Sequence, residues 1–223
     1  AGYNVTMTAQ TLQLEFGDDG SEAATTGEAR LILDVGFGSG EETATTAEMF
    51  PSCRFLGVEV HKPGLASLLK RIRRKNLTNV RVVRSDVITL LADRMKGRVF
   101  DEVWVLFPDP WSSFNKRRLI RPYFLTLLSQ RLNSGGVLRV ASDVKEYIEH
   151  VEAVMDPLLQ GPAASNDADG EKGLWVAMAD EFRDADTALP TYRGATHYEQ
   201  RALMQNGSIW ERAYCWTSTQ DGQ

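Results

Sequence analysis

From Arg30 onward, short apolar runs alternate with longer segments in which apolar residues recur every three or four positions. This alternation is typical of a mostly parallel sheet with crossover helices on both faces, so the sequence predicts an α/β fold. The apolar runs predict strands at 31–35, 54–59, 80–83, 102–107 and 136–142. The amphipathic segments predict helices at 41–49, 63–75, 88–95, 121–132 and 144–158.

The pattern changes after the last of these helices. Residues 160–173 are small, polar and acidic, which predicts a flexible surface loop. Residues 174–179 and 209–216 are apolar enough to form a C-terminal antiparallel strand or hairpin.

The first 29 residues lack a clear hydrophobic period, although Leu12, Leu14 and Phe16 alternate as in a short edge strand. We therefore predict a single domain over residues 1–223, in which residues 1–29 form an N-terminal extension. Neither a basic nor an apolar targeting segment opens the chain, and no apolar stretch approaches the roughly 20 residues that cross a bilayer.

The composition, 43% hydrophobic and 25% charged over 223 residues, is that of a globular protein with a substantial core. Two cysteines without CxxC spacing and three scattered histidines predict neither a disulfide framework nor a metal site. These features favour the reducing cytoplasm, and both a monomer and a homodimer are compatible with them.

Charge is distributed unevenly along the chain, whose net charge is −5. Residues 61–122 contain 15 Lys and Arg against 5 Asp and Glu, a local charge of +10, which leaves −15 for the remainder. Two dense basic clusters lie at residues 70–75 and 116–121. Solvated helix faces often carry such runs, but two clusters flanking a candidate catalytic loop favour a surface for a phosphate backbone.

Three glycines, Gly36, Gly38 and Gly40, separate a predicted strand from a predicted helix and allow a backbone turn close to a ligand. Their GxGxG spacing differs from the GxGxxG of dinucleotide-binding dehydrogenases, and Asp34 stands two residues before the first glycine. A carboxylate there repels a pyrophosphate but attracts a cation. Charge therefore favours S-adenosylmethionine, which carries a sulfonium and an ammonium, over NAD. A tight turn without a ligand would use the same pattern.

Two further acidic residues follow predicted strands. Glu59 lies 23 residues after Gly36, where an acid accepts hydrogen bonds from ribose hydroxyls in this architecture. Asp86 follows the third strand, from which a carboxylate can reach an adenine amino group or cap the next helix. Because the carboxyl ends of parallel strands meet at one edge, Asp34, Glu59 and Asp86 are expected to point into one crevice.

The segment Phe-Pro-Asp-Pro-Trp at 107–111 ends the fourth predicted strand. Its two prolines restrict the backbone on both sides of Asp109 and hold this carboxylate beside an aromatic ring. Such a pair can bind a planar base by its N–H edge and by its face. A stiff turn with a buried Trp is the alternative interpretation.

Taken in order along the chain, these residues resemble the bacterial-type tRNA (guanine-N7-)-methyltransferases. The resemblance extends from Leu31 to Tyr214. The segments that carry it are Asp-Val-Gly-Phe-Gly-Ser-Gly at 34–40, Gly-Val-Glu-Val-His-Lys-Pro-Gly at 57–64, Leu-Thr-Asn-Val at 77–80, Asp86, Phe-Pro-Asp-Pro-Trp at 107–111, Asn-Lys-Arg-Arg at 115–118, Ala-Ser-Asp at 141–143 and Thr-His-Tyr-Glu at 196–199. The resemblance implies a class I (Rossmann-like) methyltransferase fold and methyl transfer from S-adenosylmethionine to N7 of guanosine 46 in the tRNA variable loop.

The resemblance also implies roles for individual residues. Cofactor contacts fall on Asp34, Gly36, Gly38, Glu59, Asp86 and Asp109, and Asp109 is in addition the catalytic residue. Substrate contacts fall on Asp143, Thr196, His197, Tyr198 and Glu199, and Lys116 and Arg117 of the second basic cluster are expected to hold tRNA phosphates. The chain departs from the family pattern at Asp34 (commonly Glu), at Ser112 and Ser113 (often Lys), at His197 (usually Lys or Arg) and in the acidic insert after Leu159.

Two other functions stay open on the sequence alone. A methyltransferase for a small molecule or a protein would explain the glycines and acids but not the +10 segment. A non-catalytic partner that binds the cofactor or RNA would make Asp109 incidental. An NAD oxidoreductase is disfavoured by Asp34 and by the glycine spacing.

Overall fold

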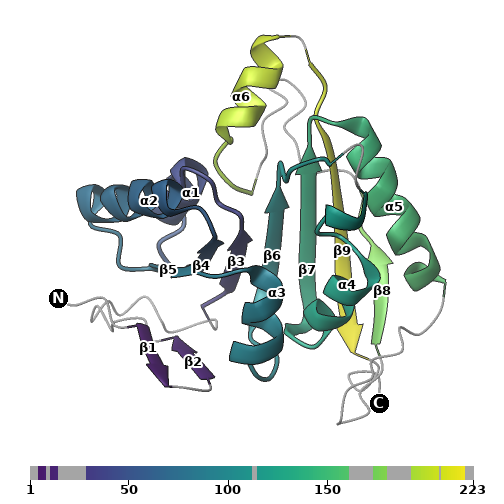
Figure 1. Cartoon of the computed structure of the whole chain (residues 1–223), viewed down its shortest axis with the longest axis horizontal. Coiled ribbons are helices and arrows are strands. Elements are labelled where there is room, and N and C mark those ends of the chain that lie inside the picture. Colours follow the sequence, from purple (N-terminus) through teal and green to yellow (C-terminus); the bar gives the residue numbers. More distant parts are fainter. Residues whose placement is uncertain are drawn as a thin grey trace.

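The computed structural model describes residues 29–111, 116–160, 173–179, 192–205 and 207–218, together with the backbone alone of residues 5–8, 11–14 and 115 (Figure 1). The strands are β1 (Val5–Thr8), β2 (Thr11–Leu14), β3 (Leu31–Val35), β4 (Arg54–Glu59), β5 (Val80–Arg84), β6 (Phe100–Leu106), β7 (Leu132–Ser142), β8 (Gly173–Ala177) and β9 (Trp210–Ser218). The helices are α1 (Glu41–Met49), α2 (Lys62–Lys75), α3 (Val87–Thr89), the π-helical η2 (Leu90–Arg94), the 3₁₀ turn η3 (Asn115–Arg117), α4 (Pro122–Ser129), α5 (Lys145–Leu159) and α6 (His197–Met204).

Seven of the strands form one sheet in the order β5-β4-β3-β6-β7-β9-β8. Neighbours from β5 to β7 pair in parallel, and β9 runs antiparallel to both β7 and β8. The predicted α/β fold with a C-terminal antiparallel strand is therefore confirmed. Of the helices in the described residues, none is both long and apolar enough to span a membrane.

Helices cover both faces of the sheet because neighbouring positions of each central strand point to opposite sides. In β3, Leu33 packs with side chains of α4 and α5, whereas Ile32 packs with side chains of α1 and α2. Both residues are almost fully buried. This burial on both faces explains why the parallel strands read as unbroken apolar runs in the sequence.

The sequence of α2 accounts for its position on the sheet. Gly64, Leu68 and Ile72, spaced four residues apart, are its buried positions and share one helix face. Asn76 ends the helix in the left-handed conformation, with φ of 52°. The last turn carries Arg73 and other basic side chains, which suit the negative end of a helix dipole.

The parallel strands end at the same edge of the sheet. Val35 of β3 pairs with Val58 of β4 and with Val105 of β6, so the loops that follow these strands lie side by side. In Figure 1 this edge is at the top, and α6 stands above it. A ligand bound at the carboxyl ends of the strands therefore faces residues from distant parts of the chain.

Three predicted elements differ in kind or position from the structure, and one helix of the structure was not predicted. The single helix expected at 88–95 is α3 followed by the π-helical η2, and the helix expected at 121–132 ends at Ser129 because β7 already begins at Leu132. The predicted edge strand near Leu12 pairs with β1 in a separate two-stranded sheet. Helix α6 was not predicted as a helix at all.

The predicted acidic loop lies almost wholly outside the described residues, and so does most of the predicted N-terminal extension. The assignment of the chain to a single domain stays a prediction.

Candidate active site

A pocket of about 690 Å³ opens at the carboxyl ends of β3, β4, β5 and β6. Its lining combines the glycine turn after β3, the ends of β4 and β5, the segment after β6 and the first turn of α6. The volume lies in the range of sites that enclose small molecules and cofactors. Residues more than 100 positions apart in the sequence thus face one space.

The glycine turn is held tightly against the neighbouring strand and helix. Gly40 precedes α1 with φ of 66°, and a Cβ there would lie 2.5 Å from Cβ of Leu68 in α2. Only glycine fits this position without displacing α2. Glu59 also holds the turn in place, since its Oε2 accepts a hydrogen bond from the Gly38 amide at 3.0 Å. Its Oε1 accepts from the amides of Val60 and His61, at 2.7 and 2.9 Å, where α2 begins.

Two buried carboxyl groups lie beneath the glycine turn. Asp34 accepts a hydrogen bond from Thr43 Oγ1 at 2.6 Å, yet its burial raises its pKa to about 6. Glu42 accepts from Thr46 Oγ1 at 2.7 Å, and burial, followed by repulsion from Asp34, raises its pKa to about 8. Both line the pocket. A ligand cation bound here would therefore meet acidic groups that a neighbouring positive charge helps to ionise.

The segment after β6 is fixed at both of its ends. The amide of Phe107 donates to Ala141 O at 2.8 Å, and Arg118 Nε donates to Pro110 O at 2.8 Å. Phe107 and Trp111 both adopt positive φ, 50° and 42°, which side-chain-bearing residues rarely do. Strain of this kind is concentrated at functional sites. Between these anchors, the side chain of Asp109 is exposed at the pocket.

Aromatic and cationic side chains form the mouth of the pocket. Tyr198, at the start of α6, is 53% exposed and stacks on Phe107 with ring centroids 5.7 Å apart. Arg117 lies over the ring of Trp111, with its guanidinium carbon 4.9 Å from the ring centroid. Flat rings and guanidinium groups of this kind provide stacking surfaces for nucleobases.

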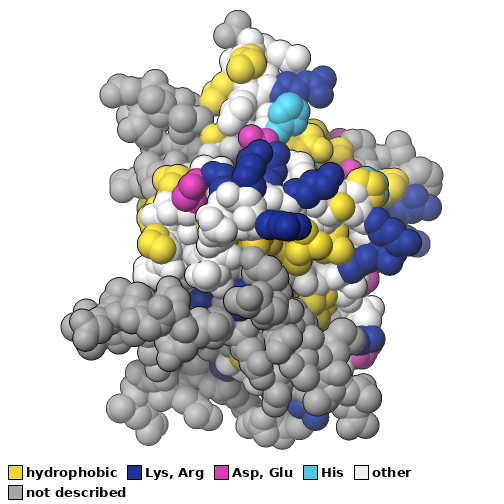
Figure 2. Space-filling view, turned by 90° about the vertical axis from the view of Figure 1, so that its left-hand side faces the viewer, with side chains coloured by type: hydrophobic (Ala, Val, Ile, Leu, Met, Phe, Trp, Pro, Cys, Tyr) yellow, Lys and Arg dark blue, Asp and Glu magenta, His cyan; other side chains and the backbone are white. Residues whose placement is uncertain are grey.

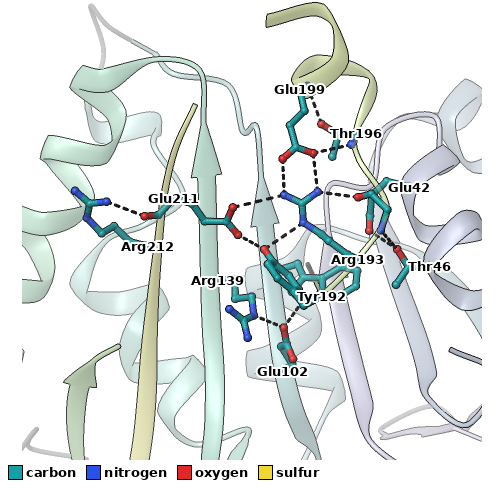
Figure 3. Close-up of polar contacts among 12 residues, drawn as sticks. Glu42, Thr46, Glu102, Arg139, Tyr192, Arg193, Thr196, Glu199, Glu211 and Arg212 are labelled. Carbon is teal, nitrogen blue, oxygen red and sulfur yellow. Dashed lines mark hydrogen bonds and ion pairs between the residues drawn. The ribbon is translucent and has the colours of Figure 1, made fainter. Parts of the chain in front are cut away.

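Beside the pocket, α6 is joined to the sheet by a buried ionic network (Figure 3). Arg193 donates two hydrogen bonds to Glu199, of 2.6 and 2.9 Å, and both side chains are fully buried. Burial alone would lower the pKa of Arg193, but Tyr192, Glu199 and Glu42 raise it well above its usual value, so Arg193 remains a cation.

The amino-acid sequence is similar to those of known proteins. Residues 28–212 match the family model described as "Putative methyltransferase". A tRNA (guanine-N(7)-)-methyltransferase of Nitrosospira multiformis is 37% identical over 185 residues, covering 82% of this chain and 73% of the relative. That of Methylobacillus flagellatus is 35% identical, covering 88% and 72%. The chain belongs to the tRNA (guanine-N7-)-methyltransferase family.

Relatives in this family are longer than the matched region. The alignment with the protein of Cupriavidus necator, 35% identical, covers 82% of this chain but 65% of the relative. Among solved structures, phosphoethanolamine N-methyltransferase 1 of Haemonchus contortus superposes with a TM-score of 0.57 at 13% identity, covering 85% of this chain and 39% of that one. An rRNA methylase from Streptococcus thermophilus gives 0.50 at 11% identity, covering 85% and 88%. These likenesses confirm the Rossmann-like methyltransferase fold.

The structure brings most of the predicted site residues of this family member into the one pocket. Those that line it are Asp34, Gly36, Gly38, Glu59, Asp86, Asp109, Arg117, Thr196, His197 and Tyr198. Asp86 also caps α3, because its Oδ1 accepts from the Thr89 amide at 3.1 Å, so the two interpretations of this residue are compatible.

Three predicted site residues do not line the pocket. Lys116 and Asp143 are exposed outside the lining, at η3 and just after β7. Glu199 is fully buried, and both of its carboxylate oxygens are bound to Arg193. A direct contact between Glu199 and a substrate base is therefore not supported by this geometry, since the carboxylate has no exposed surface.

Sequence reasoning missed Glu42 and Arg193. Neither carried a recognisable signal, because each acquires its environment from residues distant in the chain. Helix α6 did have a signal: Thr196 and Glu199 form a capping box, in which each side chain accepts a hydrogen bond from the other residue's amide. The T-x-x-E pattern predicts a helix start, whereas the family resemblance implies only substrate contacts for these residues.

The pKa of Glu42 has a measurable consequence for stability. Between its usual value of 4.5 and about 8, the folded protein holds a proton that the unfolded chain releases. The free energy of unfolding therefore falls as pH rises through this window. Glutamine at position 42 cannot ionise, so Glu42→Gln should be more stable than the unsubstituted protein at pH 9. Since one unit of pKa shift is worth about 1.4 kcal/mol, this advantage should be larger at pH 9 than at pH 6.5 by on the order of a few kcal/mol.

Thermal or urea unfolding at the two pH values measures this difference. Asp34, whose pKa is about 6, is mostly ionised above pH 6.5 and contributes little there to the slope of the free energy of unfolding against pH. Glu41→Gln, one position away on the exposed side of α1, is the matched control and should leave the pH profile unchanged. If Glu42→Gln has the same pH profile as the unsubstituted protein, the Glu42 carboxyl is ionised in the ordinary range.

Proposed function

We propose that this protein transfers the methyl group of S-adenosylmethionine to N7 of a guanosine in tRNA, at position 46 of the variable loop. The observation that carries the proposal is the composition of the pocket. Its inner wall consists of the glycine turn and carboxyl groups, and its outer wall consists of Asp109, aromatic rings and cationic side chains. The names of the curated relatives support guanine N7 of tRNA as the acceptor.

The inner wall fits S-adenosylmethionine. When bound, S-adenosylmethionine supplies a methyl group on a positively charged sulfur. Asp34, Glu42 and Glu59 supply negative or ionisable groups around the glycine turn, whereas a dinucleotide site would present amides and cations to phosphates. Gly36 and Gly38 adopt positive φ, 71° and 55°, with no atom within 4 Å of an added Cβ, and α2 packs closely beneath them because a Cβ on Gly64 would lie 2.2 Å from Gly38 O. We assign Gly36, Gly38 and Asp86 to the same cofactor site.

The outer wall fits a base whose nucleophilic atom needs no deprotonation. Guanine N7 carries a lone pair, so a general base is unnecessary and the protein contributes chiefly by alignment. Holding two reactants in line can supply about 7–11 kcal/mol in favourable cases. As positive charge develops on the base, fixed carboxylates nearby stabilise it.

We assign recognition of the base to Asp109, which lines the pocket, whereas Asp143 lies outside the lining and its contact with the substrate stays a prediction. A carboxylate can accept hydrogen bonds from guanine N1–H and the exocyclic amine, an edge that adenine does not offer. Binding that edge turns N7 toward the opposite side, where the methyl donor lies. Thr196, His197 and Tyr198 at the start of α6 are assigned to contacts with the nucleoside, and Glu199 is assigned to holding these residues in place.

The basic surface fits the phosphates of tRNA. Figure 2 looks onto the side where α2 lies, and Lys and Arg side chains predominate among the charged groups of that face. In α2, Arg71 and Lys75 pair with Glu41 and Glu48 of α1. The remaining basic side chains of the cluster, Lys70, Arg73 and Arg74, are exposed. Phosphate binding by such groups makes affinity fall steeply with salt.

The decisive experiment combines activity and mapping. Purified protein is incubated with S-adenosylmethionine labelled on its methyl group and with unmodified tRNA, and the product is digested to nucleosides. We expect labelled 7-methylguanosine, and we expect none from a tRNA in which guanosine 46 is replaced by adenosine.

Other outcomes point to other functions. If the tRNA variant without guanosine 46 still yields labelled 7-methylguanosine, the methylated nucleoside is another guanosine. Label in a protein or small molecule but not in tRNA would favour a different acceptor. Cofactor binding without any transfer would favour a non-catalytic partner.

One prediction concerns the contact between the glycine turn and α2. Gly64→Ala would place a Cβ 2.2 Å from Gly38 O and push the turn away from α2. Overpacking of this kind costs about 1–3 kcal/mol, and because the strain falls on the cofactor turn we expect affinity for S-adenosylmethionine to fall at least about tenfold. Isothermal calorimetry measures the affinity.

Gly97→Ala is the control for this experiment. Gly97 has φ of 69° and no atom within 4 Å of its added Cβ, so the substitution strains the backbone without touching the pocket. We expect it to lower thermal stability with little change in cofactor affinity. Equal losses of affinity in the two variants would contradict the local explanation.

A further inference from the structure

Helix α6 and its N-cap Thr196 supply three residues of the pocket lining, but few side chains of the helix are buried. Of its eight residues only Glu199 and Ala202 are buried, whereas Tyr198 and Met204 are 53% and 84% exposed. A short helix that buries Ala202, and its larger apolar side chains only in part, is held weakly by the hydrophobic effect. Its position must therefore depend on other contacts.

Arg193 makes those contacts. Its guanidinium binds Glu199 in bidentate fashion, donates to Gly194 O at 2.9 Å and approaches Glu211 of β9, with Nη2 and Oε2 3.9 Å apart (Figure 3). Its Nε donates to the hydroxyl of Tyr192 at 3.2 Å, and this hydroxyl in turn donates to Glu211. Paired Arg and carboxylate groups of this geometry are strong and directional.

The partner of Arg193 in α6 also caps that helix. The Oε2 atom of Glu199 accepts from the Thr196 amide at 2.7 Å, and Thr196 Oγ1 accepts from the Glu199 amide at 3.1 Å. Because both oxygens of Glu199 are bound by Arg193, the guanidinium fixes the first turn of α6. That turn presents Thr196, His197 and Tyr198 to the pocket.

The other side of the network is anchored on rigid elements near the cofactor turn. The amide of Gly194 donates to Thr46 Oγ1 of α1 at 2.9 Å, and Thr46 donates to Glu42, which lines the pocket. The ring of Tyr192 packs under the guanidinium of Arg139, whose carbon lies 4.0 Å from the ring centroid. Arg139 itself pairs with Glu102 of β6.

We propose that Arg193 is a positioning residue for methyl transfer: it holds the first turn of α6 at a fixed distance from α1 and β9, and so places the acceptor nucleoside relative to the cofactor. This inference rests on the proposed function. Arg193 does not line the pocket, so its effect on the reaction passes through Thr196, His197 and Tyr198. Burying an ion pair gains little net stability, and such pairs can instead specify one arrangement.

The test compares three variants of the full chain. Arg193→Met removes the charge but keeps the approximate length, and Arg193→Lys keeps the charge but loses the bidentate fork. Arg131→Met is the control, because Arg131 also bonds backbone carbonyls, Leu91 O and Gln130 O, but lies at the amino end of β7, away from the pocket. The measurements are kcat and KM for tRNA, the Kd of S-adenosylmethionine, and thermal unfolding.

We expect Arg193→Met to lower kcat/KM for tRNA about 100-fold, since misplacement of the reacting groups by about 1 Å can cost that much. The Kd of S-adenosylmethionine should change less than about twofold, and Arg193→Lys should recover about tenfold of the loss. Arg131→Met should lower stability without lowering kcat/KM. If Arg193→Met does not fold, Arg193→Lys carries the test: a lowered kcat/KM for tRNA with unchanged cofactor Kd supports the proposal.

Three results would overturn the inference: an unchanged kcat/KM for tRNA in the folded variants, a parallel loss of cofactor and tRNA binding, or an equal loss of kcat/KM in Arg131→Met. Amide hydrogen exchange of residues 197–204 is measured on the same samples and should be faster in Arg193→Met. If the unsubstituted protein does not methylate tRNA, the proposed function fails. The exchange rates then still decide whether Arg193 positions α6.

Discussion

Replacement of Asp109 by Ala should lower kcat for tRNA methylation by about 10²–10³-fold, the usual loss when a fixed group that stabilises transition-state charge is removed. The carboxylate is exposed at the pocket, and the segment that carries it is anchored through the backbone of Phe107 and Pro110. Removal of the side chain therefore leaves the segment in place. Cofactor affinity should stay within about threefold, because Gly38, Glu59 and the rest of the inner wall are untouched.

Single-turnover kinetics and calorimetric titration with S-adenosylmethionine separate the two effects. Asp93→Ala removes an exposed carboxylate from η2, outside the pocket lining, and serves as the matched control. Asp109→Asn should fall between the unsubstituted protein and Asp109→Ala, since its amide keeps one acceptor oxygen but places an NH₂ group against the guanine amine. Normal turnover in Asp109→Ala, or a loss of cofactor affinity equal to the loss of turnover, would remove the assigned role.

The double substitution Lys116→Glu with Arg117→Glu should weaken tRNA binding by about 10–100-fold at low salt. Lys116 is exposed on η3, and Arg117 lies at the pocket mouth over the ring of Trp111. Two cations that bind phosphates would be replaced by two repulsive charges. The slope of log affinity against log salt should decrease by roughly 0.7–0.9 for each phosphate that the protein no longer neutralises.

Filter binding or fluorescence anisotropy over a salt series measures both quantities. The matched control, Arg94→Glu with Lys96→Glu, makes the same change in net charge between η2 and β6, at the opposite edge of the sheet. It should leave affinity and slope nearly unchanged. Equal effects of the two double variants would mean that tRNA responds to net charge alone and not to the surface at the pocket mouth.

Elements whose signals lie within a few residues of each other could be predicted from the sequence, and elements that depend on distant contacts could not. The bounds of β3, β4 and α1 were predicted to the residue, because apolar runs, glycines and helix starts are encoded within a few positions. The region of α3 and η2 was predicted as one ordinary helix. Its π-helical hydrogen bonding leaves no trace in hydrophobic spacing.

The residues of the candidate site also differ in how far the sequence alone could predict their positions. Asp34, Glu59 and Asp86 could be placed in one pocket from the sequence, because each stands at or near the end of a parallel strand. Glu199 could not be placed, because its burial results from Arg193 and from the contacts of Arg193 with α1 and β9. A motif shows which residue types are present but not whether a carboxylate reaches a pocket or a buried guanidinium.

The amino-acid sequence by itself determined the alternating α/β order, the glycine turn, the acids at strand ends and the uneven charge, since all of these are properties of residues close together in the chain. Tertiary structure alone decided the raised pKa values of Asp34 and Glu42, the interior position of Glu199 and its ion pair with Arg193. The physical reason is that desolvation and ion pairing depend on what surrounds a group in space. Here those surroundings come from helices and strands up to about 150 residues away along the chain.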